Sequence, residues 1–77
     1  MSIKVRYFAS LKESLGSEGV ELFVTEPLTV EQIWSQATGQ VGLPDNILVA
    51  VNMVYVDQTV EITDGDEIAF FPPVTGG

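Results

Sequence analysis

The group in this sequence best placed to do chemistry is the carboxylate that follows Gly76 and Gly77 at the end of the chain. Cysteine and histidine are both absent, which excludes thiolate nucleophiles, an imidazole base, disulfides and the usual zinc and iron–sulfur ligands. A carboxylate is inert until another enzyme activates it, for instance as an acyl adenylate that a nucleophile can attack. The residue types therefore predict a carrier whose functional group is Gly77, without a catalytic pocket of its own.

The residues before the terminal glycines form a stiff exit from the last predicted strand. Residues 70–77 read Phe-Phe-Pro-Pro-Val-Thr-Gly-Gly, and two prolines end a strand because proline cannot continue the hydrogen-bonded ladder. We expect residues 72–77 to form a flexible, extended C-terminal tail, which can reach at most roughly 20 Å. Glycines fit a channel too narrow for a β-carbon. The residues expected to pass through such a channel in a partner are Pro73, Val74, Thr75 and Gly76.

The two aromatic residues at this exit are expected to point in opposite directions. Counted along the strand from Ile68, Phe70 shares the face of Ile68 and Phe71 does not. A sheet covered on one face can bury only one of the two rings. We therefore expect Phe71, with Pro72 beside it, to lie at a partner interface. Two terminal glycines alone would also fit a frayed end or a cloning remnant, but the proline exit from a β-rich body favours the carrier.

Charge is distributed unevenly along the chain. The only basic residues are Lys4, Arg6 and Lys12, whereas all eleven acidic residues follow from Glu13 onward, giving a net charge of −8. Such a surface repels phosphate backbones and anionic lipid, so we predict no nucleic-acid partner and no membrane partner. The charge indicates a protein partner with a basic face, or serves solubility alone. No signal-peptide block opens the sequence, and we expect a cytoplasmic protein.

The acidic residues do not form a convincing metal site. Asp64, Asp66 and Glu67 lie close together without a ligand loop, and we interpret them as turn-forming, solvated carboxylates. Asn52 is expected to fix a strand end or a turn through its side chain. We predict no metal and no cofactor bound by the chain alone.

Hydrophobic periodicity predicts a single α+β domain over residues 1–77, with a mixed sheet packed on one main helix. The main helix has a capping box from Thr29 to Gln32, ends at Gly39, and places Trp34 in the core. A shorter helix with capping-box spacing from Ser10 to Glu13 ends at Gly16. The run 47–51 is continuously apolar and predicts a strand covered on both faces, or nearly so. The remaining predicted strands cover residues 3–7, 20–24, 54–56 and 68–71.

The whole chain resembles the small, sulfur-carrier subunit of molybdopterin synthase, a ubiquitin-like β-grasp family. The most specific part is Thr63–Gly77, which is similar to the family's ending nearly residue for residue. Ala50-Val51-Asn52 matches a strand motif, Ile3–Gly16 the opening, and Leu28-Thr29-Val30 the start of the helix. Residues 39–46 are shorter than in many relatives and carry no diagnostic residue.

This resemblance implies a reaction cycle and a set of partners. A ubiquitin-activating-type enzyme adenylates Gly77 with ATP, and a sulfur donor protein converts the adenylate to a thiocarboxylate. The tail then enters the large subunit of molybdopterin synthase, in a heterotetramer, where sulfur passes to a pterin precursor of the molybdenum cofactor. Two alternatives stay open: a related sulfur carrier for thiamine synthesis or tRNA thiolation, and a non-catalytic β-grasp module that only binds proteins.

Overall fold

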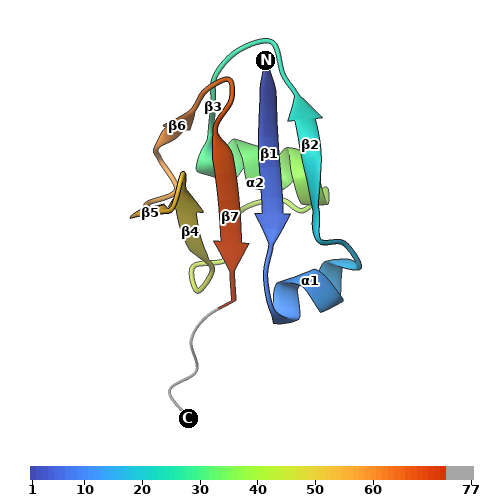
Figure 1. Ribbon diagram of the computed structural model, residues 1–77. Coiled ribbons are helices and arrows are strands. Elements are labelled where there is room, and N and C mark those ends of the chain that lie inside the picture. The colour runs from blue at the N-terminus through green and yellow to red at the C-terminus, as the bar shows by residue number, and fades with distance from the viewer. Residues whose placement is uncertain (73–77) are drawn as a thin grey trace.

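Two sheets and two helices make up the computed structural model, which describes residues 1–72 (Figure 1). The five-stranded sheet has the order β2-β1-β7-β4-β5, and β3 and β6 form a two-stranded sheet. The helices are α1 (Ser10–Leu15) and α2 (Val30–Thr38). The strands are β1 (Ser2–Tyr7), β2 (Gly19–Phe23), β3 (Leu28–Thr29), β4 (Leu48–Val51), β5 (Val54–Val56), β6 (Glu61–Ile62) and β7 (Glu67–Phe71). The predicted residues Pro73, Val74, Thr75, Gly76 and Gly77 lie outside the described part.

The centre of the large sheet joins the two ends of the described chain. β1 and β7 run parallel, with Val5 opposite Ile68 and Tyr7 opposite Phe70. The other pairs, β1–β2, β4–β7 and β4–β5, are antiparallel, so the sheet is mixed as predicted. The two-residue strands β3 and β6 were not predicted, because two residues carry no alternation that a sequence pattern could show.

The ends of α2 match their predicted signals. Thr29 Oγ1 accepts a hydrogen bond from the Gln32 backbone N–H at 3.2 Å, and the Thr29 N–H donates to Gln32 Oε1 at 2.8 Å. At the other end Gly39 adopts a left-handed conformation with φ 76°, and its N–H donates to the Ser35 carbonyl. This capping box confirms the predicted start of the main helix.

The start of α1 corrects one prediction. Ser10 is the first helical residue rather than the N-cap, and Ala9 occupies the cap with φ 52° and ψ −130° and no side-chain hydrogen bond. The predicted capping box between Ser10 and Glu13 is therefore wrong. Gly16 ends the helix in a left-handed conformation, as predicted. With six residues and no buried side chain, α1 is an appendage of the sheet rather than part of the core.

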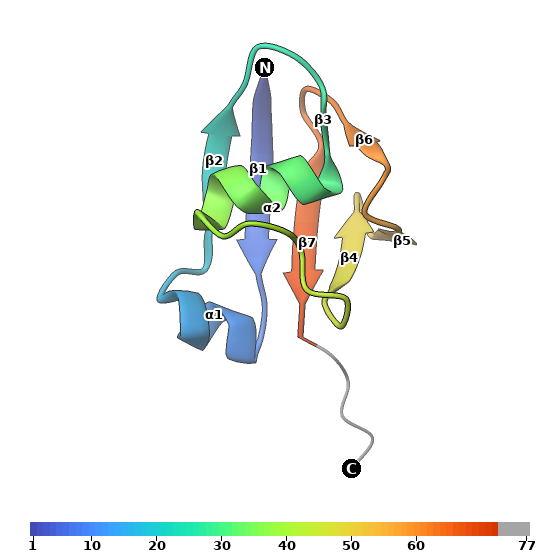
Figure 2. The same cartoon turned by 180° about the vertical axis from the view of Figure 1, so that it is seen from behind.

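The core lies between α2 and one face of the large sheet, as the two opposite views show (Figures 1 and 2). Trp34 is 1% exposed and meets Phe70 edge-on, with 4.9 Å between the ring centroids. The inward positions of the central strands alternate with outward ones, and the fully buried set includes Ile3, Val5, Ile68 and Phe70. Trp34 and Phe70 therefore belong to the core, as predicted.

The opposite face of the sheet is not covered by a helix (Figure 1). Leu48 of β4 points to this open face and is 41% exposed, whereas its neighbour Val49 points to α2 and is 4% exposed. The sequence predicts cover on both faces, or nearly so, for residues 47–51. Val49 and Ala50, on opposite faces, are buried, but Leu48 is not, so the open face of this strand is covered only in part. Among residues 1–72, no helix is both long and apolar enough to cross a membrane.

Candidate functional site

The candidate site begins where the central strand β7 ends. Because β1 and β7 run parallel, Phe8 and Phe71 emerge at the same end of the sheet. The Phe8 N–H donates to the Phe70 carbonyl at 3.1 Å, and this bond extends the β1–β7 pairing to just before Pro72. This hydrogen bond holds the end of β7 in the sheet. The chain therefore leaves the sheet at Pro72 from a central strand rather than from an edge strand.

An apolar cluster on the open face surrounds this exit, and we call Phe8, Leu48, Tyr55 and Phe71 the aromatic patch. The Phe71 ring stacks on Phe8, with centroids 4.8 Å apart and 12° between the planes. It also meets the Tyr55 ring at a tilt, at 6.3 Å. Leu48 lies directly opposite Phe71 in the β4–β7 register. Three separate chain segments thus bring their apolar side chains together around one ring.

The aromatic patch is accessible in the isolated chain. Phe8, Leu48 and Tyr55 are 40%, 41% and 70% exposed, and Phe71 is partly exposed. A contiguous exposed apolar surface on a small monomer is typical of an interaction site. The outward direction of Phe71 is confirmed. Sequence reasoning missed Phe8, although it follows Lys4 and Arg6 at a spacing of two and so shares their outward face.

A hydrogen-bonded corner holds the β4–β5 hairpin against the start of β7. Asn52 Nδ2 donates to Asp66 Oδ1 at 3.0 Å, and the Glu67 N–H donates to Asn52 Oδ1 at 3.1 Å. The Thr63 N–H donates to Asp66 Oδ2 at 2.8 Å. This contact, followed by the Asn52 amide, lowers the pKa of the Asp66 carboxyl. The predicted role of Asn52 in fixing a turn is confirmed. The corner holds the β4–β5 hairpin, which carries Tyr55 of the patch.

The acidic residues near this corner act as acceptors for the backbone. Asp64 accepts from the Ser2 N–H at 2.7 Å, and Asp66 is occupied as described above. Within residues 1–72, no three acidic, histidine or cysteine residues are grouped so as to hold a metal ion. These contacts support the interpretation of Asp64 and Asp66 as turn residues.

The patch supplies binding surface rather than reactive groups. Its side chains are aromatic or aliphatic, apart from the phenol of Tyr55. Tyr7 lies beneath it, and burial raises the pKa of its phenol, which stays protonated at neutral pH.

A mixed sheet with parallel first and last strands at its centre, packed on one main helix, is the ubiquitin-like β-grasp fold. The chain belongs to the ThiS family, whose model matches residues 5–77. Together with the curated relatives described next, this match confirms the resemblance to the molybdopterin synthase sulfur-carrier family that the sequence indicates.

Curated proteins with similar sequences agree with this assignment. The chain is 42% identical to the "Molybdopterin synthase sulfur carrier subunit" of Escherichia coli (strain K12), over 97% of the chain and 99% of that protein. It is 35% identical to the Homo sapiens protein of the same name, over 97% and 93% of the two chains.

Solved structures show the same fold. SAMP1 from Haloferax volcanii has a TM-score of 0.81 and 30% identity, with complete coverage of both chains. A complex of subunits 1 and 2 of molybdopterin-converting factor from Helicobacter pylori has a chain with a TM-score of 0.66. That chain is 23% identical over the full length of both, and the likeness shows the fold alone.

Proposed function

We propose that this chain is the sulfur-carrier subunit of a molybdopterin synthase. The observation that carries the proposal is the junction at Phe71 and Pro72. There a central strand leaves a surface-exposed aromatic patch and runs directly into a Pro-Val-Thr-Gly-Gly ending. The relative from Escherichia coli, 42% identical over nearly the full length, supports the same function.

The proposed cycle begins at the carboxylate of Gly77. In an activating enzyme, a carboxylate oxygen attacks the α-phosphorus of ATP, forming the acyl adenylate and releasing pyrophosphate. The terminal sulfur of a persulfide on a sulfur donor protein then displaces AMP and forms an acyl disulfide. A thiol attacks the donor's sulfur of this disulfide, which breaks the S–S bond and releases the thiocarboxylate. A thiocarboxylate gives a soft nucleophile to a chain that has no cysteine. Because the activation consumes ATP, we place this cycle in the cytoplasm.

Sulfur transfer takes place in the large subunit, which holds the pterin precursor. We propose that the aromatic patch docks on this subunit and that Pro73, Val74, Thr75 and Gly76 pass through its channel. The thiocarboxylate sulfur attacks an electrophilic carbon of the precursor, and water then returns the acyl group to a carboxylate. We propose that the docked assembly is a heterotetramer. The relative from Escherichia coli, which is named as a subunit of molybdopterin synthase and is 42% identical, supports a partner subunit.

Intact-mass measurement after co-expression with an activating enzyme and a sulfur donor tests the carrier function. The expected product is heavier by the difference between one sulfur and one oxygen, and a variant lacking Gly77 serves as control. Cleavage after Glu67 releases residues 68–77 as one peptide, which locates the sulfur. Trypsin is unsuitable because Lys12 is the last basic residue. A parent protein that never gains sulfur under these conditions would contradict the proposal.

A second candidate is attachment of Gly77 to lysine side chains of other proteins. The full-length likeness to SAMP1, a small archaeal modifier protein, favours it. In this reaction the lysine amine displaces AMP from the adenylate and forms an isopeptide bond. Cleavage after Glu67 would leave residues 68–77 on the modified lysine, whereas a pure sulfur carrier leaves no such remnant. Appended residues after Gly77 would abolish both activities but would not affect a module that only binds proteins.

A further inference from the structure

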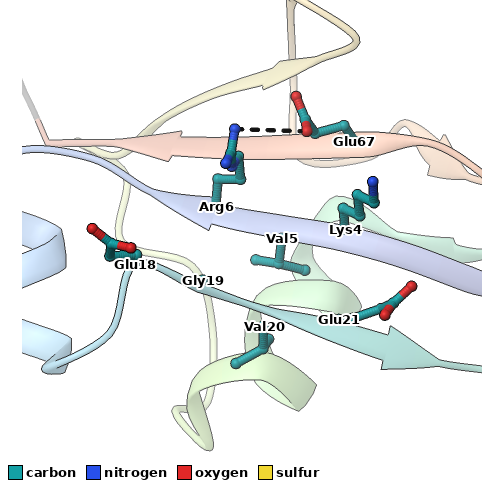
Figure 3. A pocket seen from close by; sticks show the side chains of 8 residues that line it. All are labelled: Lys4, Val5, Arg6, Glu18, Gly19, Val20, Glu21 and Glu67. Atoms are coloured by element: carbon teal, nitrogen blue, oxygen red, sulfur yellow. Dashed lines mark ion pairs between the residues drawn. The ribbon is translucent and has the colours of Figure 1, made fainter.

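All of the chain's cations lie on the open side of the sheet. Lys4 and Arg6 project from the outward face of β1, and Lys12 lies on α1 beside the end of that strand (Figures 1 and 3). Arg6 lines two adjoining hollows, one with Lys4 and the other with Lys12 and Phe8. In a chain of net charge −8, these three basic side chains lie along one surface, beside Glu18, Glu21 and Glu67, so the charges there are close to balanced.

The larger hollow, about 520 Å³, is a groove over β1, β2 and β7 (Figure 3). We call it the β1 groove; it is lined by Lys4, Arg6, Glu18, Gly19, Glu21 and Glu67, with Val5 and Val20 beneath. Gly19 lies opposite Arg6 in the β1–β2 register and has φ 154°. A β-carbon there would collide with the Val5 carbonyl oxygen, so the groove stays open at this position.

The carboxylates in the β1 groove already have partners within the chain. Glu18 forms an ion pair with Lys12 at 2.9 Å, and Glu21 accepts a hydrogen bond from the Ser2 hydroxyl. Glu67 approaches Arg6 at only 3.9 Å, through a single guanidinium nitrogen. Within residues 1–72, no carboxylate lies within 4.0 Å of Lys4. Most donors of Arg6 and the whole ammonium of Lys4 are thus available to an incoming group.

We infer that the β1 groove receives acidic side chains of the large subunit, next to the contact made by the aromatic patch. This inference rests on the proposed function. Arg6 and Phe8 are two residues apart on one face of β1, so the groove continues the patch without a break. A partner that covers Phe8 and Phe71 also covers Arg6, and its carboxylates can bind the guanidinium N–H donors that the single contact with Glu67 leaves unused.

Lys4 and Arg6 give the interface two cations within an otherwise acidic surface. The acidic remainder of the surface favours basic residues of the partner, whereas these two side chains favour acidic ones. Such a pattern fixes the register of docking and disfavours partners with a uniformly basic face. Arg6 is the central residue because its planar guanidinium binds a carboxylate with two parallel hydrogen bonds.

Two variants with equal charge change separate this contact from net charge. Arg6→Gln and Gln36→Glu each lower the net charge by one, but Gln36 is exposed on α2, on the other side of the molecule. We expect Arg6→Gln to weaken binding to the large subunit roughly fivefold to tenfold and Gln36→Glu to change it less than twofold. Equal effects of the two variants would overturn the inference, provided both are folded by circular dichroism.

Zero-length carbodiimide cross-linking of the complex tests the chemistry of the partner. This reagent joins an amine to a carboxylate only when they are in contact, so a Lys4 product identifies an aspartate or glutamate of the large subunit. We expect this cross-link to be lost when Lys4 is replaced by arginine, which keeps the charge. A complex that forms normally but yields no Lys4 cross-link contradicts the groove inference alone, whereas a parent chain that does not bind contradicts the proposed function as well.

Discussion

Phe70 and Phe71 are neighbours in sequence with opposite surroundings, which makes them a matched pair for mutation. Phe71→Ala removes the ring at the centre of the aromatic patch and should cost about 2 kcal/mol of binding to the large subunit, roughly thirtyfold in affinity. Phe70 is fully buried, so Phe70→Ala should instead lower the free energy of unfolding by about 3–5 kcal/mol. Calorimetric binding and urea unfolding measure the two effects. A folded Phe71→Ala variant with parental affinity would show that the anchor lies elsewhere.

Met53 occupies a backbone conformation that suits glycine. It has φ 71° at the second position of the two-residue β4–β5 turn, after Asn52 with φ 49°, and its side chain is 95% exposed. Turns of this kind favour Asn-Gly, because a β-carbon is strained in the left-handed region. Met53→Gly should therefore stabilise the fold by about 0.5–1 kcal/mol in urea unfolding. Met53→Ala keeps the strained β-carbon and should give no such gain.

At the scale of elements, the corner between the β4–β5 hairpin and β7 depends on an ionised Asp66. Hydrogen bonds from the Thr63 N–H and the Asn52 amide lower the pKa of this carboxyl. Its contribution to stability is therefore complete above the unfolded value of about 3.9 and is lost as pH falls through the lower folded value.

We expect Asp66→Asn to be less stable than the parent at pH 6 and to approach it as the pH falls below about 4. Urea unfolding of both proteins at several pH values measures this convergence. A constant difference in unfolding free energy between the two proteins across this range would show that the ionised corner contributes nothing to acid sensitivity.

The elements that the sequence predicted well are those with local signals. The α2 capping box from Thr29 to Gln32 and the inward side of Phe70 follow from spacing alone. The aromatic patch could not be predicted as a unit, because Tyr55 and Leu48 reach Phe71 only through the register of β5, β4 and β7. The Ala9 cap was missed for a related reason. Ala9 has a positive φ of 52°, which no local sequence preference of alanine indicates.

For the molecule as a whole, the net charge of −8 should govern the rate of encounter more than the final affinity. Association with the large subunit should slow as ionic strength rises, because salt screens long-range attraction to a basic face. Dissociation should change little, since the aromatic patch is apolar. Stopped-flow measurements over a range of salt concentrations separate the two rates. An association rate independent of salt would remove the overall charge from the binding mechanism.

Folding and function should separate cleanly at the end of the chain. Within residues 1–72, the buried hydrophobic side chains of the core all lie between Ile3 and Phe70, and we expect the fold not to need Gly77. Deletion of Gly77 should therefore leave the melting temperature within about 2 °C of the parent, the expected effect of well under 1 kcal/mol. The same deletion should abolish sulfur transfer, because the residue that becomes terminal is one position short of the activation site.

Gly76→Val provides a subtler test, since its branched side chain widens the tail and restricts its backbone without shortening it. If its thiocarboxylate can be prepared, it should convert the pterin precursor far more slowly than the parent. A large loss of melting temperature on deletion of Gly77, or a parental conversion rate for the Gly76→Val thiocarboxylate, would mean that these residues act through the fold or that the channel is wide.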